Sequence, residues 1–218
     1  MKYNSSHTEY INKKGVEVPS VTTIIKILNK PSLVKWANYM GFKRQDVDYL
    51  LEKSSHIGTC VHDLVESYLM NYYYIFIPTD YWTSYTFKLY MDTIMEWRSS
   101  HNIDPIFSEK KFCSERFGGT VDFYGVIDNN HTIIDFKTSK RFYSTMFLQL
   151  AAYCIMLEEN NYKVDQVGIV ILNPEGYNEK IITREELTPY IDTFRLLVEL
   201  FHKWFDLNIE KGWGNILV

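Results

Sequence analysis

The stretch that decides the fold is a pair of runs, GTVDFYGVI (119–127) and TIIDFKT (132–138), separated by DNNH (128–131). Both runs are rich in β-branched and aromatic residues, which are common in strands. The Asn-rich segment between them is typical of a tight hairpin turn. The sequence therefore predicts two antiparallel strands joined by a short turn.

Charged side chains of this hairpin are expected on one face. If residues 129–130 form the turn, Tyr124 pairs with Asp135 and Asp122 pairs with Lys137. Paired residues share a face, and so do residues two apart on one strand, so the carboxylates and the lysine project together. The other face collects apolar side chains: Val121, Phe123, Ile127, Ile134 and Phe136. A one-residue slip would put the charges in the core, and the pattern therefore favours this register.

Two carboxylates and a lysine on one sheet face have a chemical use. Asp122 and Asp135 would repel each other unless a cation lies between them, and oxygen ligands favour magnesium or manganese. Lys137 would then position or deprotonate an attacking water, or offset charge in the transition state. The alternative is an exposed ion-pair ladder, which is common on hairpins. The apolar surroundings of the motif make isolated surface charges less expected here.

Other polar residues are candidates for the same site. His62 and Glu66 lie one turn apart on an expected helix (56–71), and a solvated helix face is the alternative for both. Gln149 and Tyr153 share a face of the helix expected after the hairpin, where Gln149 needs a hydrogen-bond partner if it is buried. Glu109, in the strand before the hairpin, is a candidate for contact with a metal's ligands.

The rest of the chain predicts an α/β domain with a central mixed sheet, helices on both sides and a helical N-terminal region. Ser20 and Ser32 are expected to cap the first two helices. Further expected elements are a small hairpin at 8–18 and helices at 33–42, 46–51, 56–71, 80–99, 143–160 and 184–206. Strands are expected at 106–113, 166–172 and 178–183. Residues 1–218 are expected to form one domain, divided into a mainly helical part (1–105), a sheet core (106–183) and a C-terminal helical part (184–218).

Composition restricts the functional classes. The chain has 218 residues and a net charge of −4, which is unusual for a nucleic-acid binder but compatible with an acidic metal site. Cys60, Cys113 and Cys154 are far apart, so no zinc or iron–sulfur cluster is expected. No apolar run approaches the length of a membrane span, and no apolar leader is present, so a cytoplasmic location is expected.

Several motifs together resemble the PD-(D/E)xK nuclease superfamily, in particular the RecB-like exonuclease branch, which includes phage exonucleases and the mitochondrial genome maintenance exonuclease. The resemblance is carried in chain order by GTCVH (58–62), GGTVD (118–122), IIDFKTSK (133–140) and QLAAY (149–153). The segments PSVTTII and LVKWA near the N-terminus are similar to the mitochondrial group. Each motif alone is weak, but the ordered set is specific.

The resemblance implies a restriction-endonuclease-like core and a role for each motif residue. His62, Asp122, Asp135 and the Phe136 carbonyl would bind Mg²⁺ or Mn²⁺, and Lys137 would be the catalytic lysine. Gln149 and Tyr153 would match the family's Gln-xxx-Tyr motif, which orders the active site and the DNA. The cysteines of the iron–sulfur-containing relatives are missing, which argues against those branches.

The expected substrate is DNA, as single strands or duplex ends. Lys35 and Trp36 would contact it from the N-terminal helices, and Ser139, Lys140 and Arg141 would contact it after the active strand. A homo-oligomer, or a recombination or single-strand-binding partner, is a further expectation. The rival readings are an inactive DNA-binding module of the same fold and a site-specific or structure-specific endonuclease.

Overall fold

The computed structural model describes residues 9–28, 31–71 and 81–210. Within these ranges, none of the helices is both long and apolar enough to cross a membrane. The small hairpin predicted at the N-terminus is present, with β1 (Tyr10–Ile11) paired to β2 (Glu17–Val18) across a turn that includes Gly15 at a φ of 75°. Residue 8, the first of the predicted hairpin range, lies outside the described residues.

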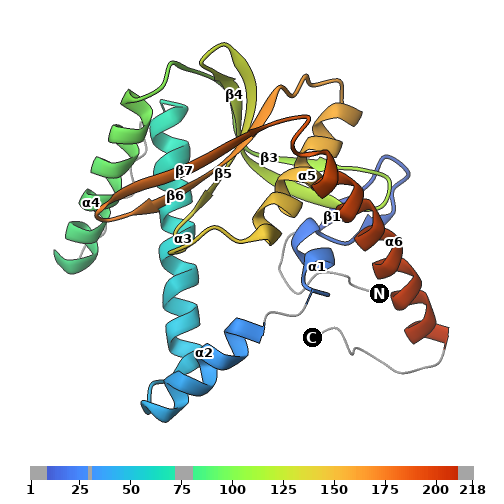
Figure 1. The fold of residues 1–218 in the computed structure, drawn as a ribbon, viewed down its shortest axis with the longest axis horizontal. Coiled ribbons are helices and arrows are strands. Elements are labelled where there is room, and N and C mark those ends of the chain that lie inside the picture. The colour runs from blue at the N-terminus through green and yellow to red at the C-terminus, as the bar shows by residue number, and fades with distance from the viewer. Residues whose placement is uncertain (1–8, 29–30, 72–80, 211–218) are drawn as a thin grey trace.

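The centre of the molecule is a mixed sheet with the order β3-β4-β5-β6-β7. Its strands are β3 (Ile103–Cys113), β4 (Gly118–Ile127), β5 (Asn130–Lys137), β6 (Gln166–Asn173) and β7 (Gly176–Thr183). β5 and β6 are parallel, because α5 (Ser144–Glu159) connects them as a crossover, and the other neighbours are antiparallel. The predicted mixed sheet with helices on both sides is confirmed (Figure 1).

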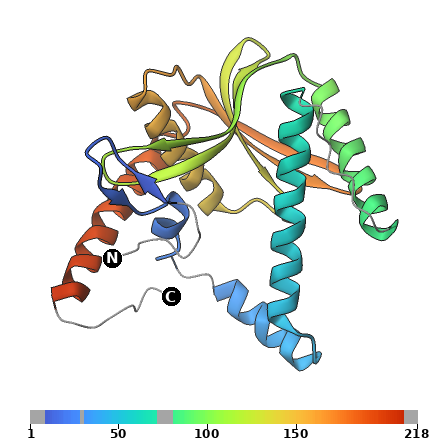
Figure 2. The same cartoon turned by 180° about the vertical axis from the view of Figure 1, so that it is seen from behind.

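Helices cover the sheet from two sides. α3 (Val47–Leu69) and α4 (Tyr81–Ser99) lie on one side, while α1 (Val21–Ile25), α5 and α6 (Thr188–Glu210) lie on the other (Figures 1 and 2). α2 (Pro31–Phe42) packs against the N-terminal half of α3 and projects with it beyond the sheet. We call α2 and this half of α3 the helical arm.

The core has a layer on each face of the sheet. The layer under α5 and α6 contains Tyr124, Ile133 and Ile169, and the layer under α3 and α4 contains Phe123, Ile134 and Trp97. α5 is apolar nearly all round and is buried along most of its length, since it lies between the sheet and α6. The alternation of residues 123, 124, 133 and 134 between the layers matches the two-residue period of a strand.

The turn of the β4–β5 hairpin differs from the prediction. Ile127 pairs with Asn130, so the turn residues are Asp128 and Asn129, with φ values of 50° and 69°. Both left-handed values are those of a type I′ turn, for which Asp-Asn is as well suited as Asn-Asn. Tyr124 therefore pairs with Ile133 rather than Asp135. The register moves by two residues, so the expected faces of the charged residues do not change.

One apolar residue of the hairpin was assigned to the wrong face. Val121 belongs to the layer under α5, with Tyr124, and not to the layer that contains Phe123. Glu109 of β3 has a left-handed backbone (φ 47°) here, and it lies between the pairs Ser108–Phe123 and Lys110–Val121 without a pair of its own in the ladder. A local change of twist at such a point breaks the simple alternation of side chains.

The helix boundaries also correct the sequence analysis. Residues 46–51 and 56–71 were predicted as separate helices, but α3 is continuous from Val47 to Leu69 and is capped by Asp46, whose carboxylate accepts a hydrogen bond from the Tyr49 amide. Ser54 and Ser55 lower the stability of a helix only slightly, so the prediction of two separate helices was wrong. α2 begins at Pro31, which places Ser32 in the first turn and not at the cap. The Ser20 cap of α1 is confirmed.

Candidate active site

The site lies where β4 and β5 separate. Their last paired residues are Phe123 and Ile134, and Asp122 and Asp135 come next on each strand. The two strands are held together at this point by a side chain, because Asp122 Oδ2 accepts a hydrogen bond of 3.0 Å from the Phe136 amide. Both carboxylates are buried, Asp135 completely.

Asp135 and Lys137 form a close ion pair. The Lys137 ammonium donates a hydrogen bond of 2.6 Å to Oδ1 and also lies 2.6 Å from Oδ2, so it forms an ion pair with both carboxylate oxygens. Burial raises the pKa of Asp135 to about 7, although Lys137 acts in the opposite direction. Burial lowers the pKa of Lys137, but the charges of Asp135 and Asp122 outweigh it, so that pKa is raised and the amine stays protonated. A carboxylate that is buried beside a second carboxylate is a feature that a bound cation would explain.

His62 reaches the same point from α3. Its Nδ1 lies 3.1 Å from Glu109 Oε1 and 3.6 Å from Asp122 Oδ2, and its Nε2 lies 3.0 Å from the Phe136 carbonyl oxygen. Burial lowers the pKa of His62, but the hydrogen bond to Glu109 and the charge of Asp122 prevail and raise it to about 9. The imidazolium therefore donates from Nδ1 to Glu109 and from Nε2 to the Phe136 carbonyl, and it forms an ion pair with Asp122.

Glu109 is closer to the centre than its place in the sequence indicated. His62, Glu109 and Asp122 each offer a ligand atom, and these atoms all lie within 4.8 Å of one another. Glu109 holds this position with a left-handed backbone, a costly conformation that occurs often at functional sites. The sequence indicated this role of Glu109 only weakly, since charged residues are frequent in a strand at the edge of a sheet. The donor set of imidazole and carboxylates fits a magnesium or manganese ion.

α5 closes the other side of the site. Gln149 Nε2 donates a hydrogen bond of 2.6 Å to the Tyr153 hydroxyl, so the predicted pair on one helix face is in direct contact. Burial raises the pKa of Tyr153 well above its ordinary value, and the charges of Asp122 and Asp135 raise it further. Gly119 permits the close approach of the Tyr153 ring, because a Cβ there would lie 2.9 Å from that ring.

Glu66 borders the site without joining it. It lies one turn after His62 and is half-buried, and no hydrogen bond or ion pair links it to the cluster in the described part of the chain. Burial raises its pKa, and the negative charges of Glu109 and Asp63 add to this effect. The side chain therefore increases the negative potential on the α3 side of the site.

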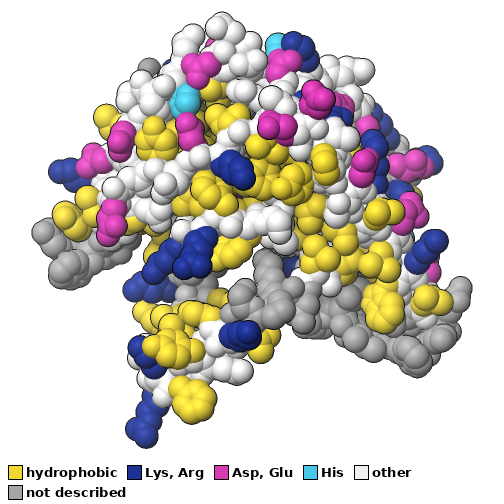
Figure 3. All heavy atoms as spheres, viewed as in Figure 1, with side chains coloured by type: hydrophobic (Ala, Val, Ile, Leu, Met, Phe, Trp, Pro, Cys, Tyr) yellow, Lys and Arg dark blue, Asp and Glu magenta, His cyan; other side chains and the backbone are white. Residues whose placement is uncertain are grey.

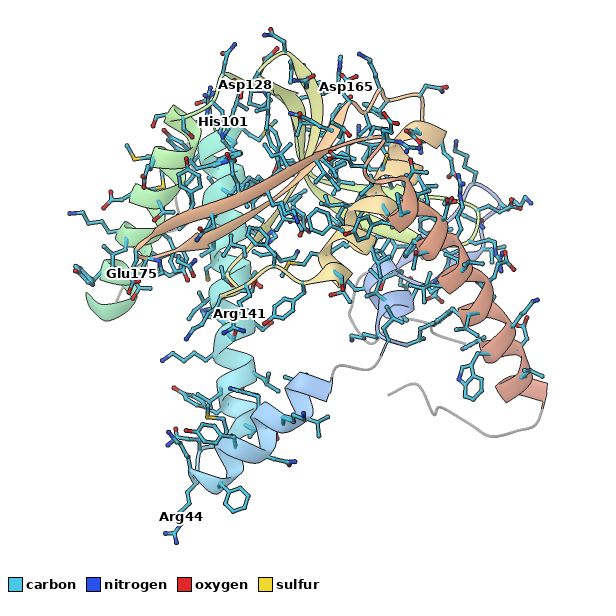
Figure 4. All side chains as sticks on the ribbon, viewed as in Figure 1. Arg44, His101, Asp128, Arg141, Asp165 and Glu175 are labelled. Carbon is cyan, nitrogen blue, oxygen red and sulfur yellow. The ribbon has the colours of Figure 1, made fainter. Side chains whose placement is uncertain are left out.

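The expected substrate contacts are in two places. Ser139, Lys140 and Arg141 lie in the loop after β5, where Ser139 donates to the Arg141 carbonyl. This loop runs beside α3, since a Cβ at Gly58 would lie 3.7 Å from Thr138 Oγ1, and Figure 4 shows Arg141 next to that helix. Lys35 and Trp36 lie on α2, and within the described ranges no hydrogen bond or ion pair connects them to the cluster.

A family model for the PD-(D/E)XK nuclease superfamily matches residues 35–210, which is most of the chain. The protein belongs to this superfamily. The match includes the β4–β5 hairpin, all of α3 and α5, and therefore contains every element that meets at the site. Among curated proteins, no sequence matches this chain.

Three solved structures match this chain at low identity. The crystal structure of SSO0001 is 14% identical and has a TM-score of 0.40, with 89% of this chain and 79% of that chain covered. A phage-related exonuclease from Haemophilus somnus 129PT is 15% identical with a TM-score of 0.41, over 70% of this chain and 82% of that one. LHK-Exo in complex with dAMP is 11% identical with a TM-score of 0.33, over 58% and 72%. These values are too low to bear on the substrate of this protein.

Proposed function

We propose that this nuclease-superfamily protein is a divalent-metal-dependent DNA exonuclease, which hydrolyses phosphodiester bonds with a water nucleophile. The observation that carries the proposal is the meeting of His62, Glu109 and Asp122 with the buried Asp135–Lys137 pair at the separated ends of two strands. Phage-type recombination, replication or repair is the setting that we propose for it. An inactive binding module would have no physical need for this costly arrangement.

The proposed metal ligands are His62, Asp122, Asp135 and the Phe136 carbonyl, and we add Glu109 to this proposal. Support comes from the spacing of the donor atoms, the burial of the Asp135 carboxylate and the mutual repulsion of the carboxylates. A bound Mg²⁺ or Mn²⁺ would polarise a phosphoryl oxygen and lower the pKa of a water. The proton now on His62 would have to leave before its imidazole could serve as a ligand.

Lys137 is proposed as the catalytic lysine. Its ammonium is fixed on the Asp135 carboxylate and stays charged, so its role is to orient the water and to offset the charge that develops on the phosphate. The water oxygen forms a bond to phosphorus, the bond to the leaving oxygen breaks, and a proton released by the water ends on that oxygen, which becomes a hydroxyl. The protonated state favours positioning by Lys137 over removal of the water's proton.

Gln149 and Tyr153 are proposed as positioning residues. The Tyr153 hydroxyl accepts from Gln149 and keeps its own proton, so it remains available as a donor. A neutral donor at that point can hold a carboxylate or a phosphate oxygen without adding charge.

The DNA strand is proposed to enter from the side of the helical arm. Figure 3 shows lysine and arginine side chains beside the hollow between the arm and the body, and Arg141 lies on this side next to α3 (Figure 4). Cations at a strand entry attract phosphates even when the whole chain has a net charge of −4. We propose contacts from Lys35, Trp36, Ser139, Lys140 and Arg141.

The test is digestion of linear and covalently closed circular DNA, each as single strands and as duplexes. An exonuclease degrades only the linear forms, with magnesium or manganese and not with EDTA, and a label at either end gives its polarity. Cutting of the circles would replace the proposal by an endonuclease. Binding of DNA without cleavage under any of these conditions would favour the inactive module.

A further inference from the structure

α6 carries a row of exposed apolar side chains. They are spaced by three or four residues, which puts them on one face of the helix. We call them the apolar row: Leu196, Leu200, Trp204 and Leu207, with exposed fractions of 71%, 55%, 45% and 49%. Large apolar side chains gathered in this way on a soluble protein mark an interaction surface more often than singly scattered ones do.

A second row of α6 is charged and lies beside the first. Its members each precede a residue of the apolar row and are all exposed: Arg195, Glu199, Lys203 and Asp206. The signs alternate along the helix, positive, negative, positive and negative. We call them the charged row.

Two copies of the charged row are complementary in charge when they run antiparallel. A two-fold axis near residue 201 brings Glu199 beside the partner's Lys203 and Arg195 close to the partner's Asp206. In a parallel pair, each residue would face its own copy, and like charges would repel. In a dimer with two-fold symmetry, both copies contribute the same surface. With the helices antiparallel, the apolar rows contact each other and opposite charges of the charged rows face each other.

We infer that α6 is the contact surface for a second copy of this chain, with the two helices antiparallel. The helix lies at the outer edge of the molecule in both ribbon views, with hydrophobic side chains exposed in the same region of Figure 3. The ion pairs that Glu199 and Arg195 form within the chain leave their side chains exposed. Glu199 pairs with Arg116 but its side chain stays 54% exposed, and Arg195 lies 3.8 Å from Asp192 with 65% exposed.

The test begins with the mass of the full chain by light scattering across a dilution series. A dimer has about twice the 25.9 kDa chain mass and dissociates on dilution. Leu200→Asp should abolish it. Glu199→Lys and Lys203→Glu should each weaken it by about tenfold or more, because like charges then meet twice across the axis. Circular dichroism checks that each variant is folded.

Mixing the two single variants separates this interface from effects within one helix. In the heterodimer, the two substituted positions face each other with opposite charges at one contact, and the native Lys203 of one chain faces the native Glu199 of the other at the second. The mixture should therefore form a heterodimer although neither variant dimerises well alone. Within one chain, residues 199 and 203 remain like-charged in both variants, so an intrahelical effect cannot restore association. A monomer at every concentration, or a dimer that ignores Leu200→Asp or gains nothing from mixing, would overturn the inference in favour of another occupant of the row.

Discussion

Asp135→Asn should make the metal-free protein more stable while removing its activity. The Asp135 carboxyl is completely buried, and its pKa is raised from 3.8 to about 7. The native state therefore keeps a proton that the unfolded chain loses between these values. Stability falls as the pH rises through this window, because ionisation is less favourable in the native state.

The magnitude follows from the width of the window. A difference of about three pH units at about 1.4 kcal/mol each gives about 4 kcal/mol above pH 7. Asparagine has the shape of the neutral acid and avoids this cost, but Lys137 loses its nearest counter-charge. We therefore expect a gain of about 2 kcal/mol near pH 8, and little below about pH 3, where the native and the unfolded wild-type chains both hold the proton.

The assay is urea unfolding in EDTA at several pH values, with the wild type and Asp135→Asn side by side. The matched control is Asp165→Asn, because hydrogen bonds from Lys163 and the His131 amide hold the pKa of Asp165 at about 2. This control should lose stability at neutral pH. If Asp135→Asn is the less stable protein near pH 8, or if its gain is the same at all pH values, the reasoning about the buried carboxylate is wrong.

Other predictions concern the metal, the sheet and the first helix. Because the pKa of His62 is about 9, the apparent affinity for Mn²⁺ by calorimetry should rise about tenfold per pH unit from about pH 7 to 9, and a flat profile would exclude His62 as a ligand. Gly125→Ala should cost about 1–3 kcal/mol in thermal unfolding, since its Cβ would lie 2.6 Å from the Asp104 carbonyl oxygen. Gly41→Ala is the control, with open space around its Cβ, and an equal loss in both would refute the steric account. Ser20→Ala should cost about 1 kcal/mol by urea unfolding, since Ser20 Oγ accepts a hydrogen bond from the Thr23 amide, and no change would show that the cap is not needed.

The sequence predicted the faces of the central hairpin better than its register. The two-residue period put Asp122, Asp135 and Lys137 together whichever pair of residues formed the turn, because both registers preserve the faces. The choice between Asp128-Asn129 and Asn129-Asn130 depends on backbone angles that residues of either kind accept.

The errors arose where tertiary structure overrides local preference. The serines in the middle of α3 looked like a boundary, but that helix is continuous and carries His62 to the sheet. Glu109 was expected to stand behind the ligands, and its direct contact with His62 depends on a left-handed backbone that no pattern in the chain announces. Val121 changed face at the same irregularity.

The most direct test of the central claim is single-turnover cleavage of an end-labelled DNA strand in Mn²⁺ by the wild type and by Lys137→Ala. The account predicts that cleavage requires the metal and that the variant, folded as judged by circular dichroism, is slower by about 10²–10⁴-fold. Lys163→Ala, which changes an exposed lysine outside the site, should cleave at the wild-type rate. Cleavage by Lys137→Ala at an unchanged rate would contradict the account, because the ammonium on Asp135 would then have no part in the chemistry.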